Sequence, residues 1–172
     1  MSDTSTIATH WKHCMKSIRF IFIILTRAWS VPLTRKFMYS DAIVRLIGAW
    51  VLIKLVPYKL WRDILGQPGT YGAVATLTFE QAEMAYNIAS LHGVLQKAFG
   101  TRFTCLMLAL SARGMLKARD VPSQLILGVN RKASEHTGSP LCAHAWVTSF
   151  NVQIIGHESS ETFTAVAFYD KY

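Results

Sequence analysis

The residues of this chain best suited to catalysis are a cysteine and a histidine 39 positions apart. Cys105 opens the segment CLMLALSARGMLKA, whose leucines and alanines form a helical stripe, and Thr104 before it is a helix-capping residue type. Unpaired N–H groups and the dipole at a helix N-terminus favour the thiolate, which is the nucleophilic form. His144 begins the strand-like run AHAWVTSF and could accept the thiol proton. Position alone leaves a buried core thiol as the alternative for Cys105.

A second cysteine lies much closer to His144 in the sequence. Cys142 precedes it by two residues, so the two side chains share one face of an extended strand. They could form one edge of a metal site, with further ligands from His136, His157, His10, His13 or Cys14. However, the chain has no Cys-x-x-Cys and no structural zinc spacing. We therefore predict no metal, and Cys142 as a small apolar neighbour of the site.

The elements that must position these residues follow an α+β pattern. Thr78 and Gln81 form a capping-box pattern, which predicts a helix that runs to about Phe99 and stops at Gly100. The helix that starts at Cys105 comes next, followed by the buried strand SQLILGV. Three further strand-like runs are AHAWVTSF, NVQIIG and TFTAVAFY. Their succession predicts an antiparallel meander packed against the helices.

Charge divides the chain into two parts. Residues 1–72 hold ten Lys and Arg against three Asp and Glu, whereas residues 73–172 hold eight against seven. The change coincides with GQPGTYG, the best linker candidate. We therefore predict a disordered tail over 1–15, a basic helical layer over 16–72 and the catalytic core over 73–172.

The basic layer contains an amphipathic pattern after Ser40, which we expect to cap a helix. Asp41 should pair with Arg45 one turn later. The expected buried face consists of Ile43, Leu46, Ile47 and Trp50. The apolar runs FIFIILT and LIGAWVLI hold seven and eight residues between charges, far fewer than the roughly 20 that span a bilayer. Peripheral contact with a membrane through basic and tryptophan side chains stays open.

Composition narrows the setting of the protein. With 51% hydrophobic and 16% charged residues, the 172-residue chain has the composition of a folded domain. Three cysteines and no secretory signal pattern indicate a reducing compartment, the cytoplasm. The basic part could attract an acidic partner, but the aromatic residues fall on expected buried faces. Because no nucleic-acid-binding motif is present, nucleic acid is not an expected partner.

The segment CLMLALSARGMLKARDVPSQLILGV followed by AHAWV resembles the leader peptidase (B-type protein) of lasso peptide biosynthesis, a transglutaminase-like cysteine protease family. The segment DAIVRLIGAWVLIKLVPYKLWRDILG resembles the same family, so the resemblance covers roughly residues 40–169. It implies a transglutaminase- or papain-like core, with the cysteine on a helix N-terminus packed on an antiparallel sheet, preceded by a small helical layer. It also implies Cys105 as nucleophile and His144 as general base.

The third catalytic residue departs from the family pattern. Many relatives carry an Asp near the end of the strand that follows the histidine strand, and the equivalent position here is about Gly156. Glu158, two residues further along the same face of an extended strand, is the expected substitute. A Cys–His dyad with no third side chain, or a ring oriented by a backbone carbonyl, is the alternative.

The resemblance also implies a function and partners. The protein would remove the leader from a lasso precursor peptide, delivered by a separate leader-recognition protein, beside a macrolactam cyclase. ATP dependence is implied for some relatives, yet the sequence has no phosphate-binding loop, and no other cofactor is expected. Two alternatives remain: acyl transfer to an amine, as in transglutaminases, and a non-catalytic basic adaptor of a biosynthetic complex.

Overall fold

The computed structural model describes residues 33–70, 76–130, 142–150, 152–156 and 162–170. Contacts divide the chain into residues 1–40 and a compact unit of residues 41–172, which contains the sheet. The elements are α2 (Leu33–Leu55), α3 (Tyr58–Trp61), the 3₁₀ helix η1 (Arg62–Leu65), α4 (Phe79–Phe99), the 3₁₀ helix η2 (Gly100–Arg102), α5 (Cys105–Lys117), β1 (Gln124–Asn130), β2 (Cys142–Ser149), β3 (Val152–Ile155) and β4 (Thr164–Tyr169). The predicted boundary after residue 72 lies outside the described residues, as does the predicted tail.

The mixed helix and antiparallel-sheet architecture predicted from the sequence is confirmed, but the meander is wrong in its last strand. The sheet has the order β3-β2-β1-β4, so β4 returns to pair with β1. All three pairings are antiparallel. A physical reason is that β1 is largely buried and apolar, and a partner on each edge satisfies its backbone groups.

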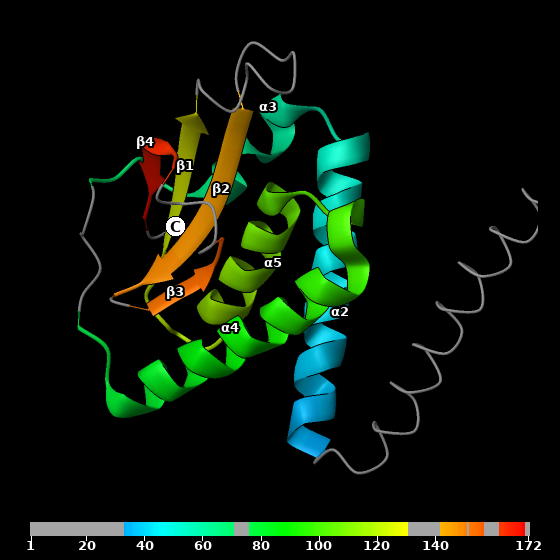
Figure 1. Ribbon diagram of the computed structural model, residues 1–172, viewed down its shortest axis with the longest axis vertical. Coiled ribbons are helices and arrows are strands. Elements are labelled where there is room, and N and C mark those ends of the chain that lie inside the picture. The colour runs from blue at the N-terminus through cyan, green and yellow to red at the C-terminus, as the bar shows by residue number, and fades with distance from the viewer. Residues whose placement is uncertain (1–32, 71–75, 131–141, 151, 157–161, 171–172) are drawn as a thin grey trace, which may run out of the picture. The chain divides into compact units, whose positions relative to one another are not determined.

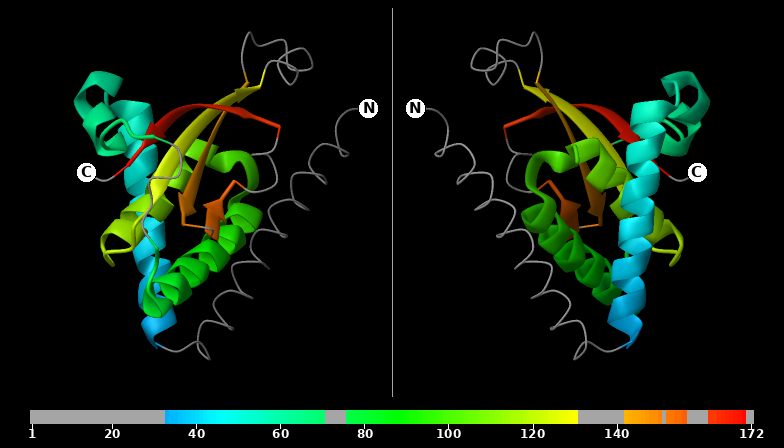
Figure 2. Two further views of the ribbon diagram at one scale, coloured as in Figure 1. Left: turned by 90° about the vertical axis from the view of Figure 1, so that its left-hand side faces the viewer. Right: turned by 90° about the vertical axis from the view of Figure 1, so that its right-hand side faces the viewer.

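Helices α4 and α5 lie on one side of the sheet, as Figures 1 and 2 show. Helix α5 packs against β1, β2 and β3, while α4 packs against β3 and α5. Nine of the 13 residues of α5 are buried, which makes it the central helix of the unit. None of the helices within the described residues is sufficiently long and apolar to cross a membrane.

Both helix starts predicted for the core are confirmed. The Thr78 hydroxyl accepts a hydrogen bond from the Gln81 N–H at 3.3 Å, and the Gln81 side chain accepts one from the Thr78 N–H at 3.1 Å. This capping box begins α4, which ends at Phe99 as expected. Gly100 follows with a φ of 55°, a left-handed conformation that glycine adopts without steric cost.

Helix α2 begins earlier than predicted and buries a different face. It starts at Leu33, so Ser40 lies inside the helix and does not cap it. The predicted pair is confirmed, because Nε of Arg45 lies 2.6 Å from a carboxylate oxygen of Asp41. The buried residues are Ala42, Leu46 and Ala49, whereas three of the four predicted core residues are at least 40% exposed: Ile43, Ile47 and Trp50.

Small side chains explain why α2 turns this face inward. With alanines at the contact, α2 approaches α5 so closely that the Ser111 hydroxyl donates a hydrogen bond to the Ala42 carbonyl at 3.2 Å. Nε2 of the buried His92, on α4, lies 3.2 Å from the same hydroxyl, and its Nδ1 donates to the Ile88 carbonyl at 3.0 Å. A buried polar chain therefore joins α2, α4 and α5.

A second buried polar group lies further along α5. The side chain of Arg113 is 1% exposed, and its guanidinium donates hydrogen bonds to the carbonyls of Leu65 and Asp170. Leu65 ends η1, and Asp170 follows β4. Arg113 thus connects the central helix to segments from both ends of the compact unit.

Candidate active site

Cys105 is the first residue of α5, as the sequence predicted. Its position is fixed by Thr104, the N-cap, whose hydroxyl accepts a hydrogen bond from the Met107 N–H at 3.4 Å. The thiol is free and half-buried. The first N–H groups of a helix have no intrahelical acceptor, so this end of α5 can hold negative charge on the sulfur or on a bound carbonyl oxygen.

His144 lies on β2, near the start of the strand. It pairs with Gly128 of β1, which on its other edge pairs with Ala165 of β4. The imidazole stacks on the indole of Trp146, with ring centroids 5.9 Å apart and planes 23° apart. The phenyl ring of Phe163, immediately before β4, lies 5.0 Å from the imidazole. Two aromatic side chains from different segments therefore pack against the imidazole of the half-buried His144.

Gly128 makes room for this aromatic cluster. A Cβ atom at position 128 would lie 2.7 Å from two atoms of the Trp146 ring and 3.1 Å from the Thr164 carbonyl oxygen. The glycine of the predicted Leu-x-x-Gly-Val strand is not required by its backbone conformation, since its φ is not left-handed. It is required because a side chain would collide with the indole. It allows the indole of Trp146 to lie against β1 beside the imidazole.

The edge of the imidazole that carries Nε2 faces the main chain at Gly156. A Cβ atom at that residue would lie 2.9 Å from Nε2 and 2.7 Å from Cβ of Trp146. Nε2 is buried and has no hydrogen-bond partner of normal geometry among the described residues. Burial lowers the pKa of His144 from 6.5, and the nearby Gly156 backbone raises it in part.

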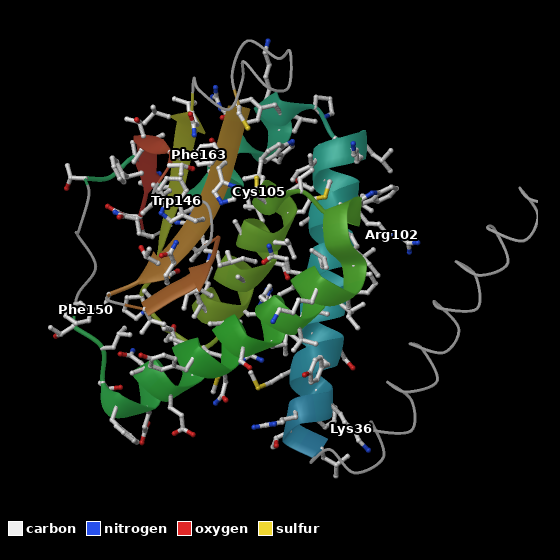
Figure 3. The ribbon with its side chains drawn as sticks, in the orientation of Figure 1. Lys36, Arg102, Cys105, Trp146, Phe150 and Phe163 are labelled. Atoms are coloured by element: carbon white, nitrogen blue, oxygen red, sulfur yellow. The ribbon has the colours of Figure 1, made fainter. Side chains whose placement is uncertain are left out.

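The two predicted catalytic side chains come from elements that pack on each other, since α5 lies against β2. Figure 3 shows Cys105, Trp146 and Phe163 in the same region of the molecule in that view. A lowered histidine pKa keeps the imidazole neutral near pH 7, which is the state a general base requires. In such an arrangement the imidazole accepts the thiol proton, and the thiolate that results can attack.

The remaining predicted residues fall in different places. Cys142 is a free, half-buried thiol at the start of β2. Glu158 lies outside the described residues, as do the other proposed metal ligands, His10, His13, Cys14, His136 and His157. Within the described ranges, no group of three His, Cys, Asp or Glu side chains could hold a metal ion.

Sequence reasoning did not identify Phe163 as part of the site. Its only signal was a place at the start of the strand-like run TFTAVAFY, which the meander placed beside β3. Phe163 reaches His144 because β4 pairs with β1, and the pairing aligns Ala165 with Gly128 and Gly128 with His144. The missing information was thus the order of the strands.

An open pocket of about 700 Å³ lies elsewhere on the compact unit. Its lining comes from α2, η1 and the middle and C-terminal end of α5, and includes Arg45, Asp63, Ile64, Leu110 and Lys117. Cys105 stands at the opposite end of α5 and takes no part in it.

A cysteine at the N-terminus of a central helix, packed on an antiparallel sheet that carries a half-buried histidine, is the arrangement expected of cysteine-nucleophile acyl-transfer folds. A family model for the transglutaminase-like superfamily matches residues 61–167, which is more than half of the chain. The protein therefore belongs to the transglutaminase-like superfamily, which indicates a cysteine peptidase or an acyltransferase. Searches of the curated proteins and of the solved structures found no match.

Proposed function

We propose that the protein is a cysteine peptidase that removes the leader from a lasso peptide precursor. The observation that carries the proposal is the combination of Cys105 at the start of α5 with a half-buried imidazole on β2. Membership of the superfamily supports the chemistry. The choice of substrate rests on the sequence resemblance in the cysteine helix, the Gly-Val strand and AHAWV.

The reaction follows from the residues present. His144 takes the thiol proton of Cys105, and the sulfur attacks the scissile carbonyl to form a C–S bond. The N–H groups at the start of α5 stabilise the oxyanion. The protonated imidazole then gives its proton to the leaving amine as the C–N bond breaks. A water molecule, deprotonated by His144, hydrolyses the thioester and restores the thiol. No step requires ATP.

The proposal includes a separate recognition protein that delivers the precursor. The outward face of α2 offers a docking surface, because four apolar residues on one helical stripe are exposed: Val44, Ile47, Val51 and Leu55. Basic residues, Arg45 and Lys54, accompany the stripe along α2. The macrolactam cyclase would act on the product of cleavage.

The test is leader release from the precursor, followed by mass spectrometry with and without the recognition protein. We expect cleavage by the wild-type chain and a loss of at least about 100-fold for Cys105→Ala, because the substitution removes the sulfur that forms the thioester. Cys142→Ala is the matched control and should retain activity. Normal cleavage by Cys105→Ala would end the cysteine-peptidase proposal.

The superfamily also includes acyltransferases, so transfer to an amine is the second candidate. The same thioester would then be resolved by an amine in place of water. Product mass distinguishes the two reactions, because hydrolysis adds water to the acyl product, whereas transfer adds the amine. An amine adduct formed faster than the hydrolysed product would favour transfer.

A further inference from the structure

We infer that the Gly156 main chain, and not an acidic side chain, orients the imidazole of His144 and leaves Nδ1 as the nitrogen that can accept a proton. This inference rests on the proposed function, because it assigns the general base a tautomer and a positioning residue.

There is little space between Nε2 of His144 and the main chain at Gly156. The Cβ position of residue 156 is only 2.9 Å from this nitrogen, whereas ordinary contacts are near 3.5 Å or longer. No side-chain atom of residue 156 can therefore stand between its main chain and the ring. Nε2 is also closed off from solvent. The backbone of Gly156 itself occupies the place from which a partner residue would support the imidazole.

The backbone conformation of Gly156 also requires a glycine. Its φ is 86°, a left-handed value that side-chain-bearing residues rarely adopt. Any other residue at this position would suffer backbone strain as well as contact with Nε2 and with Cβ of Trp146. For both reasons, this arrangement requires glycine at position 156. An aspartate there would fit only if the backbone or the ring moved.

Aromatic side chains pack against other sides of the His144 ring. Trp146 stacks on the imidazole, and Phe163 lies at a tilt of 37° to it. These two rings restrict rotation of the imidazole, which is one of the tasks that an acidic partner usually performs. The Gly156 main chain lies beside Nε2 and raises the pKa of His144, so it favours a proton on that nitrogen, and the Nε2–H tautomer fits this environment. In that tautomer Nδ1 carries the lone pair that a general base needs.

Few titratable side chains stand near His144 among the described residues. Cys142 lies on the same strand, and Cys105 begins the helix packed against it. Strand β2 is flanked by β1 and β3, and neither of these two strands contains a titratable side chain. The described surroundings therefore supply no carboxylate from the neighbouring strands.

The decisive experiment is ¹⁵N NMR of the His144 ring across pH in the full chain, which needs no substrate. We expect the neutral ring to be the Nε2–H tautomer, with a pKa below 6.5 that is unchanged in Glu158→Gln. An Nδ1–H tautomer would overturn the inference. So would a pKa that falls by one unit or more in Glu158→Gln, because it would show that this carboxylate supports the ring.

A kinetic comparison adds a second measurement. Gly156→Ala should lower kcat at least about 100-fold at unchanged KM, because it displaces the imidazole that acts in the chemical step. Gly93→Ala is the matched control, because a Cβ atom there meets no atom within 4 Å. Activity of Gly156→Ala equal to that of the wild type would contradict the inference. If no variant cleaves any precursor, the proposed function fails, whereas the NMR result still decides the tautomer.

Discussion

The contact between Gly128 and Trp146 permits a stability prediction with a defined sign. In Gly128→Ala, the new methyl group would lie 2.7 Å from Cη2 and Cζ3 of the indole, compared with ordinary carbon contacts of about 3.5 Å. The indole must therefore move by roughly 0.8 Å, counted from that contact distance. Trp146 is only 7% exposed and packs on His144, so it has little room to move.

The magnitude follows from two opposing effects. Overpacking of this kind costs about 1–3 kcal/mol. Replacement of glycine by alanine restricts the unfolded chain, which returns about 0.4–1 kcal/mol. We expect a net loss of roughly 1–2 kcal/mol in the free energy of unfolding, the difference between these two ranges near their centres. Gly93→Ala, in helix α4 with open space around its Cβ, should instead gain about 0.5–1 kcal/mol.

Urea unfolding followed by tryptophan fluorescence measures both variants against the wild type. The same chemical change should shift the midpoint in opposite directions at the two positions. If Gly128→Ala is as stable as the wild type while Gly93→Ala is stabilised, then the indole does not rest on Gly128 and the reasoning is refuted. Reduced activity of Gly128→Ala would follow from displacement of Trp146 from the imidazole.

Two further predictions concern the cap of α5 and a buried histidine. Thr104→Ala removes the acceptor of the Met107 N–H and should cost about 1 kcal/mol in urea unfolding, whereas Thr104→Ser should cost much less; equal losses would contradict the capping role. Burial lowers the pKa of His92 from 6.5, so the unfolded chain binds more protons there and stability should fall as pH drops below about 6.5. His92→Gln should flatten this dependence between pH 7.5 and 5.5, and an unchanged slope would exclude His92 as its source.

The sequence predicts well those features that depend on neighbours in the chain. The Thr78–Gln81 capping box and the Thr104 cap each involve groups within three residues, so residue type and spacing decide them. The strand segments are likewise marked by their apolar, β-branched composition. The position of Cys105 at a helix start was predictable for the same reason.

Features that depend on distant partners were missed. The buried face of α2 is set by close approach to α5 through Ala42 and Ala49, whereas large apolar residues in the sequence favoured another face. Pairing of β4 with β1 brings Phe163 to His144, and no local pattern encodes that choice. At Gly156, the sequence supplied the equivalent position of the missing acid, but only the backbone path shows its approach to Nε2.

The buried guanidinium of Arg113 has a consequence for synthesis of the protein. Its two acceptor carbonyls lie 48 residues before it and 57 residues after it. A cation without those acceptors would be costly to enclose, by about 3–5 kcal/mol for a buried charge that loses its partner. During translation, we therefore expect α5 to stay loosely packed until residue 170 has left the ribosome. Arrival of the Asp170 carbonyl would then close the core and, with it, the thiol site that α5 begins.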